Sequence, residues 1–185
     1  MIKYILAVML AMLGITATQA QRMMPGQKGI EINAGLLSKE VSDNYYLNLT
    51  LTTYAKSGGY WLWGAEYTHQ LADYRNLHIP LETYTGEIGY SLQLLGDARK
   101  TITLNAGLTA IGGYETINRS EATLYDGSKI LDKDHFIYGA GGRLSFETYL
   151  SDRFVLLLQG RAKVVWGTDL KQFRPSAGVG LRFNF

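Results

Sequence analysis

The chain has 185 residues, enough for one domain with a sizeable core. It carries 18 basic and 16 acidic residues, and a net charge of +2 gives no reason to expect direct nucleic-acid binding. It has no cysteine, which excludes disulfides, thiolate metal sites and a lipid-modified N-terminal cysteine. The 21 glycines and 13 tyrosines, with only three prolines, favour strands over long helices.

The first twenty residues are predicted to be a secretory signal peptide. Lys3 supplies a positive start, the segment 4–15 is apolar, and Ala20 is the small residue before Gln21. The apolar run is about twelve residues long, whereas a membrane-spanning helix needs about 20. We therefore expect cleavage of residues 1–20, a short N-terminal segment at 21–28, and export to the outer membrane or, alternatively, the periplasm.

Beyond residue 28, polar and apolar residues alternate with a period of two along nearly the whole chain. Helical periodicity is hard to find in this part. The alternation predicts eight strands, at residues 29–37, 45–55, 60–70, 82–94, 101–114, 136–149, 154–166 and 175–185.

The connections between these strands alternate in length. The longer ones are residues 38–44, 71–81, 115–135 and 167–174, and the tight ones are 56–59, 95–100 and 151–153. Long loops on one rim and tight turns on the other are typical of outer-membrane barrels, whose turns face the periplasm. We therefore predict an all-β, antiparallel up-and-down barrel of about eight strands over residues 29–185, with both termini on the periplasmic side.

The polar face of the strands is sparse in charge and rich in small residues. Its mid-strand charges are balanced in sign: Glu31, Glu66, Glu87 and Glu147 against Arg143, Arg161, Lys163 and Arg182. This composition suits the narrow lumen of an eight-stranded barrel, which side chains can fill. Because an unpaired buried charge costs several kcal/mol, we expect an internal ion-pair network and a closed lumen.

The apolar face is predicted to meet lipid. It carries aliphatic residues at strand centres and aromatic ones towards strand ends, as interfacial girdles do. The alternative is a soluble, lipocalin-like barrel with the apolar face inside, which would bind lipid or a small ligand. The chain ends in PSAGVGLRFNF, and its alternation persists to Phe185, which we interpret as a signal for outer-membrane assembly.

No residues point to catalysis, a cofactor or a metal. His69, His78 and His135 lack metal-ligand spacing, and no G-x-S-x-G nucleophile motif is present. The glycine clusters at 139–142 and 178–180 lie inside predicted strands, so close backbone approach explains them better than phosphate binding. If the protein binds a partner outside the membrane, the charged loop 115–134 and the aromatic, basic segment 72–80 are the candidates.

Several long segments resemble one family. The segments QRMMPGQKGIEINAG, IPLETYTGEIGYSLQLLGD, YGAGGRLSFETYLSDRFVLLLQGR and FRPSAGVGLRFNF resemble the TraO family of conjugative-transposon transfer proteins. The resemblance implies a component of a type IV secretion-like mating apparatus, with other transfer proteins and outer-membrane lipid as partners. It offers no catalytic residues. The expected role is an outer-membrane anchor or scaffold that docks other transfer proteins by its periplasmic rim or its long loops.

Overall fold

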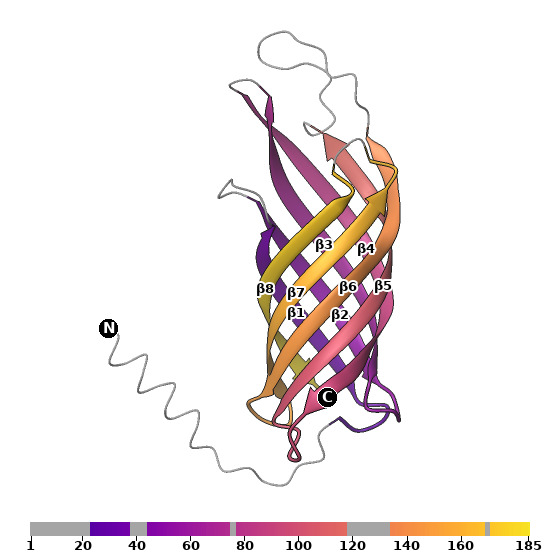
Figure 1. Ribbon diagram of the computed structural model, residues 1–185, viewed down its shortest axis with the longest axis vertical. Helices are drawn as coiled ribbons and strands as arrows, with labels where there is room; N and C mark the ends of the chain where they lie inside the picture. Colours follow the sequence, from indigo (N-terminus) through magenta and orange to yellow (C-terminus); the bar gives the residue numbers. More distant parts are fainter. Residues whose placement is uncertain (1–22, 38–43, 75–76, 118–133, 169–170) are drawn as a thin grey trace, which may run out of the picture.

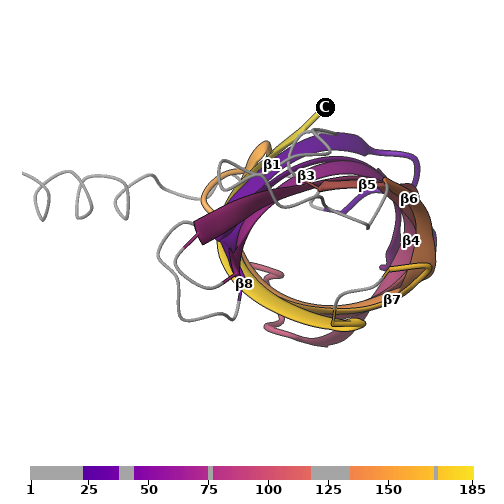
Figure 2. The same cartoon turned by 90° about the horizontal axis from the view of Figure 1, so that it is seen from above.

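The computed structural model describes residues 23–37, 44–74, 77–117, 134–168 and 171–185. Eight antiparallel strands form a closed barrel in chain order, and β1 pairs with both β2 and β8 (Figures 1 and 2). The described residues contain no helix long and apolar enough to cross a membrane. The strands are β1 (Lys28–Leu37), β2 (Tyr45–Tyr54), β3 (Tyr60–Tyr74), β4 (Leu77–Gly96), β5 (Ile102–Ile117), β6 (His135–Tyr149), β7 (Phe154–Trp166) and β8 (Phe173–Asn184).

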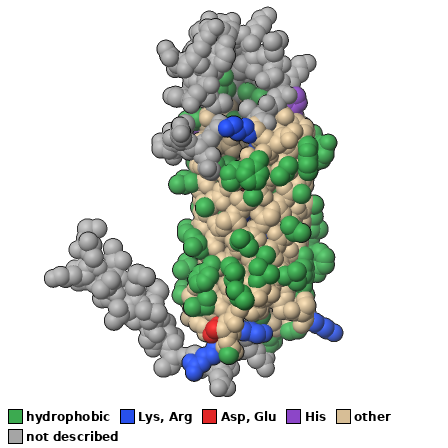
Figure 3. Space-filling view, viewed as in Figure 1, with side chains coloured by type: hydrophobic (Ala, Val, Ile, Leu, Met, Phe, Trp, Pro, Cys, Tyr) green, Lys and Arg blue, Asp and Glu red, His purple; other side chains and the backbone are tan. Residues whose placement is uncertain are grey.

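The period-two pattern of the sequence separates an apolar outer wall from a mostly polar interior. In β7, Val155, Leu157 and Gln159 are buried inside, while their neighbours Leu156 and Leu158 are exposed. Figure 3 shows apolar side chains on the visible face of the outer wall. The alternative of a barrel with its apolar face inside is therefore wrong, because most apolar residues of the alternation are exposed on the outer wall and their polar neighbours are buried.

The two ends of the barrel differ. We call the end with the short connections 55–59, 97–101 and 150–153 the turn end, and the opposite end the loop end; the C-terminus lies at the turn end (Figure 1). Near the turn end the interior holds an apolar cluster, the floor, which lies below the charged residues. The floor comprises Met23, Tyr54, Tyr60, Leu62, Tyr149 and Val155.

The barrel closes along the pair of β1 and β8. Lys28 and Phe185 exchange two backbone hydrogen bonds, of 2.8 and 3.2 Å, so the last residue of the chain completes this seam. Further along, Gly35 stands opposite Gly178. A Cβ atom on Gly178 would lie 2.4 Å from the Tyr46 hydroxyl oxygen and 2.4 Å from the carbonyl oxygen of Ala34. Only glycine therefore leaves room for the Tyr46 ring at the seam.

The eight predicted strands are confirmed, but one predicted loop is wrong. Residues 71–81 are mostly strand: β3 continues to Tyr74, β4 begins at Leu77, and Leu71 pairs with Pro80. The strands of this hairpin pair through their backbones, and beyond the barrel wall their side chains need not alternate between polar and apolar. The period-two pattern therefore did not predict it. Of the predicted loop 115–135, residues 115–117 belong to β5 and His135 to β6, while 118–133 lie outside the described residues.

Candidate functional site

The lumen is the place where the sequence concentrates buried charge, and Arg182 of β8 is its most enclosed cation. Its guanidinium donates to Glu31 at 2.7 Å and to Glu147 at 2.8 Å. It also donates to the hydroxyl groups of Tyr54 at 2.8 Å and Tyr60 at 3.0 Å, two residues of the floor. Since Arg182 and both carboxylates are fully buried, every charge here depends on its partners.

Glu31 of β1 links this cluster to the next layer of the lumen. Its other carboxylate oxygen accepts hydrogen bonds from Arg143 at 2.8 Å and Gln159 at 2.7 Å. Asn33, two residues along the same face of β1, donates to it at 2.6 Å. One carboxylate thus receives donors from three other strands, which ties β1 to β6, β7 and β8 across the lumen.

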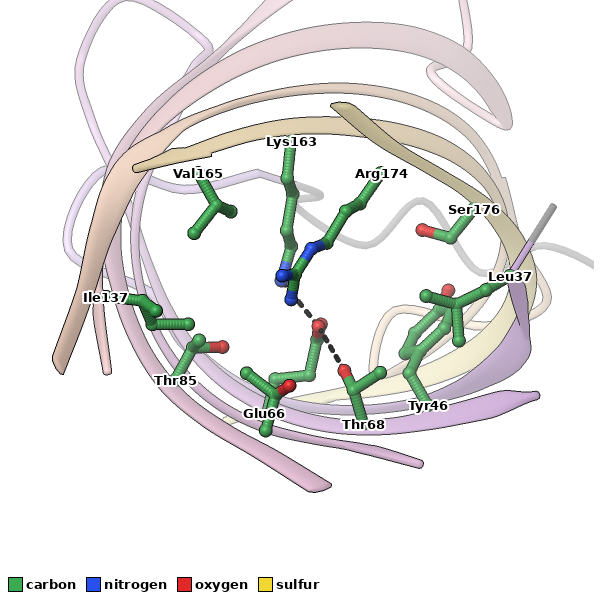
Figure 4. Close-up of a pocket in the computed structure, with 11 residues that line it drawn as sticks. Leu37, Tyr46, Glu66, Thr68, Thr85, Ile137, Lys163, Val165, Arg174 and Ser176 are labelled. Atoms are coloured by element: carbon green, nitrogen blue, oxygen red, sulfur yellow. Dashed lines mark hydrogen bonds and ion pairs between the residues drawn. The ribbon is translucent and has the colours of Figure 1, made fainter. Parts of the chain in front are cut away.

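A second cluster lies nearer the loop end. Arg161 of β7 pairs with Glu87 at 2.7 Å and also with Glu66, and its guanidinium lies 5.1 Å from the centre of the Tyr46 ring. Lys163, two residues further on, pairs with the same two carboxylates. Figure 4 shows the Lys163 side chain directed towards Glu66 from the opposite wall. This cluster therefore binds β7 to β3 and β4, which lie across the lumen.

A third ion pair at the loop end was not predicted. Arg174 of β8 pairs with Glu115 of β5 at 2.7 Å, and Thr168 donates to the same carboxylate at 2.6 Å. The prediction placed Glu115 in a loop and Arg174 in a connection. A signal was present nonetheless, because each residue continues the polar alternation of its strand by one further step.

A small cavity lies in the charged part of the lumen. The cavity beneath Arg174 has a volume of about 20 Å³, room for about one water molecule. Among the described residues, no three His, Asp or Glu side chains are grouped to hold a metal ion. The ion-paired side chains of the interior are balanced in sign: Glu31, Glu66, Glu87, Glu115 and Glu147 with Arg143, Arg161, Lys163, Arg174 and Arg182. The arrangement links strands on opposite sides of the lumen through paired charges.

The structure places the predicted lumen residues together and Phe185 apart from them. All eight predicted side chains are buried in the interior, in the first two clusters described above: Glu31, Glu66, Glu87, Arg143, Glu147, Arg161, Lys163 and Arg182. Phe185 lies on the outer wall, 61% exposed, with its ring centre 6.4 Å from that of Phe183. Buried tyrosines of the interior, among them Tyr54 and Tyr60, were not predicted as network members because tyrosine suits either face.

The outer wall has the dimensions of a bilayer core. β7 has 13 residues and begins and ends with the exposed aromatic residues Phe154 and Trp166. At about 3.3 Å per residue and a tilt of about 40°, these two lie about 30 Å apart along the barrel axis, close to the apolar band of outer-membrane barrels. The exposed aromatic residues of the described wall are Tyr45, Trp61, Trp63, Tyr84, Tyr114, Phe136, Tyr138, Phe154, Trp166, Phe173, Phe183 and Phe185.

Three solved structures that are similar to this one are outer-membrane barrels. Neisserial surface protein A is 11% identical to this chain, with a TM-score of 0.60; the match covers 86% of this chain and 95% of the neisserial protein. Ail of Yersinia pestis is 14% identical, with 88% and 100% of the two chains covered and a TM-score of 0.58. The N-terminal barrel domain of Pseudomonas aeruginosa OprF is 11% identical, with 87% and 98% covered and a TM-score of 0.50.

These identities are low, so the three structures support the fold alone. A comparison with curated proteins found no match. The family described as conjugative transposon protein TraO matches residues 24–185, which include every strand of the barrel. The resemblance found in the sequence is thereby confirmed, and the chain belongs to the TraO family of conjugative transposon proteins.

Proposed function

We propose that this protein is an outer-membrane anchor or scaffold of the conjugative mating apparatus and catalyses no reaction. Family membership supports a part in conjugative transfer, and the apolar outer wall supports a location in the outer membrane. Residues 1–20 would act as the cleaved signal peptide, and a type IV secretion-like assembly would supply the partner proteins. Partners would contact the barrel outside the membrane, at its loop end or at its turn end.

The filled lumen is the observation that carries the scaffold role. Side chains from opposite walls meet in ion pairs at three levels, and the floor lies below them. A DNA strand would have to break all of these pairs in order to pass. The barrel therefore serves transfer by holding other components in place, while DNA takes another route.

Gene deletion tests the role in transfer. We expect an in-frame deletion to reduce transfer frequency strongly, and the wild-type gene supplied in trans to restore it. Transfer at the wild-type frequency, with the neighbouring transfer genes still expressed, would refute the role in mating. Such a result would favour a stand-alone barrel that binds lipid or a small ligand.

A matched variant tests whether the lumen has a chemical task. Replacing both members of the loop-end pair, with Glu115→Gln and Arg174→Gln, removes the charges without leaving one unpaired. We expect this double variant to restore transfer to the deletion strain at the wild-type level. Reduced transfer at a normal membrane level of the variant would contradict a purely structural lumen.

The membrane location has its own test. A folded barrel in membrane fractions should migrate differently on a detergent gel before and after boiling, because strand pairing resists the detergent until it is heated. The outer-membrane fraction should contain the protein after washing with salt and carbonate. Recovery in the soluble periplasmic fraction, with no change of mobility on heating, would overturn the proposed location.

A further inference from the structure

The turn end of the barrel carries a ring of basic side chains that form no ion pair with the described residues. We define the basic ring as Lys28, Lys56, Arg99, Lys100 and Arg153, all of which are exposed. They lie at the β1–β8 seam and in the β2–β3, β4–β5 and β6–β7 connections, which together are the four strand junctions of this end. Figure 3 shows blue side chains along this rim below a band of apolar ones.

None of the five forms an ion pair with another described residue. The acidic groups at this end are Asp97, Asp152 and the C-terminal carboxylate, and Asp97 is already engaged by the backbone of its own turn. The opposite end differs among the described residues: its cations are Lys171 and Arg174, Arg174 pairs with Glu115, and Glu82 and Asp134 are two further acids at this end. Among the described residues, the surplus of positive charge thus lies at the turn end.

Aromatic residues lie directly beside the basic ring on the outer wall. Trp61 packs against Tyr90 with ring centres 5.0 Å apart, and Phe154 against Phe183 at 5.2 Å. Aromatic side chains at this level mark the boundary between the lipid tails and the headgroups. The cations just beyond them therefore lie at the depth of lipid phosphates.

We propose that the basic ring binds the phosphates of anionic phospholipids in the leaflet that surrounds the turn end. A lipid leaflet encircles the barrel, and cations at all four junctions match that geometry, whereas an acidic protein partner would cover one side or the mouth. Each basic side chain near an anionic membrane surface adds to the attraction, which falls off within a Debye length. The inference rests on the proposed membrane location but does not depend on the part in transfer.

The three tryptophans of the chain allow a test at both ends. Two single-tryptophan proteins, one keeping Trp61 at the turn end and the other Trp166 at the loop end, are made with Phe at the remaining positions. Each is folded into vesicles of phosphatidylcholine and phosphatidylglycerol in which either lipid is brominated. Quenching then gives the relative affinity of the two lipids beside each tryptophan, and the heat-dependent mobility change verifies insertion.

We expect phosphatidylglycerol to be preferred about threefold or more beside Trp61 and to show little preference beside Trp166. The triple variant Lys56→Gln, Arg99→Gln, Lys100→Asn should abolish the preference at Trp61; asparagine suits position 100 because its φ is 51°. Lys171→Gln is the matched control at the loop end and should leave the preference unchanged. Equal preference at both ends, or an unchanged preference in the triple variant, would overturn the proposal for an inserted protein.

Discussion

Single side chains inside this barrel carry charges that depend on partners from distant parts of the chain. Arg161 is the clearest case, because its guanidinium joins two carboxylates and also covers the Tyr46 ring. Among the described residues, Lys163 is the one other cation that pairs with these acids. The loss of Arg161 would leave two buried carboxylates facing one ammonium group.

We expect Arg161→Ala to lower the free energy of unfolding by about 3 kcal/mol or more, as for other broken buried pairs. Urea unfolding in detergent micelles measures this change. Arg161→Met keeps most of the aliphatic volume and should be almost as destabilising, since the pairing is lost in both variants. Arg153→Ala, which removes an exposed arginine, should change the stability by less than about 0.5 kcal/mol. Near-wild-type stability of Arg161→Ala would show that the pairs contribute little.

Asp97, in the β4–β5 turn outside the wall, makes the turn end sensitive to acid. Its carboxylate accepts backbone N–H groups from Ile102 at 2.8 Å and Thr101 at 2.5 Å, and these hydrogen bonds hold its pKa below the ordinary value. A lowered pKa in the folded state stabilises the turn at pH values above the pKa of an unfolded aspartate, about 3.9. That contribution is lost as the pH falls through the lower pKa of the folded state.

We therefore expect faster amide hydrogen exchange at Thr101 and Ile102 as the pH falls below about 4, after correction for the intrinsic rate. Asp97→Asn should show the faster exchange at neutral pH and no such acid transition. An NMR titration of the Asp97 carboxyl carbon gives the pKa directly. A midpoint at or above the ordinary value for aspartate would contradict the assigned role of the two hydrogen bonds.

At the scale of strands, the seam between β1 and β8 sets the closure of the barrel. Gly178→Ala would force its Cβ against the Tyr46 hydroxyl and the backbone of β1. We expect it to cost about 1–3 kcal/mol, as overpacking does, and to lower the yield of folded barrel on heat-shift gels. Gly160→Ala is the control on the neighbouring strand β7, because a Cβ there meets nothing within 4 Å. Equal effects of the two substitutions on stability would mean that the β1–β8 seam can accommodate an extra methyl group at position 178.

Most strands could be predicted because side chains that face the lumen are mostly polar, whereas their neighbours on the outer wall are apolar. The alternation therefore located β7 at its observed bounds, Phe154–Trp166, and the other strands to within a few residues except at the β3–β4 hairpin. This hairpin extends beyond the barrel wall, where side chains need not alternate between polar and apolar. The pairing of Leu71 with Pro80 therefore could not be predicted from the period-two pattern.

The partners inside the lumen could not be predicted in the same way. Alternation predicted that Glu31 and Arg182 face inward, and the closure of an up-and-down barrel made them neighbours. The contact of Glu31 with Arg143 depends instead on the shear of the barrel, which sets the heights of strands that are not adjacent. A period-two pattern shows which face of a strand a residue lies on, but not its height along the barrel axis relative to residues of a distant strand. The third pair, Glu115 with Arg174, was missed for a related reason, because its members lie where the strand ends were uncertain.

At the scale of the whole molecule, the start of β1 and the end of β8 meet at the turn end. Phe185 closes the seam with Lys28 through its backbone and exposes its ring on the outer wall beside Phe183. The ring itself makes no contact with the charged lumen, since it lies on the outer wall. Its contribution to the stability of the folded barrel is therefore expected to be small, whereas an exposed terminal ring is well placed for recognition during assembly.

We expect deletion of Phe185 to reduce the amount of protein in the outer membrane several-fold, while the same variant folded in detergent loses less than about 2 kcal/mol. Immunoblots of fractionated cells and urea unfolding of the purified protein measure the two effects separately. Phe185→Trp, which keeps an aromatic ring and the backbone hydrogen bonds, should reach the normal level in the membrane. Phe185→Ala keeps the backbone alone and should resemble the deletion. If Phe185→Ala accumulates normally while the deletion does not, the seam hydrogen bonds matter for assembly and the ring does not.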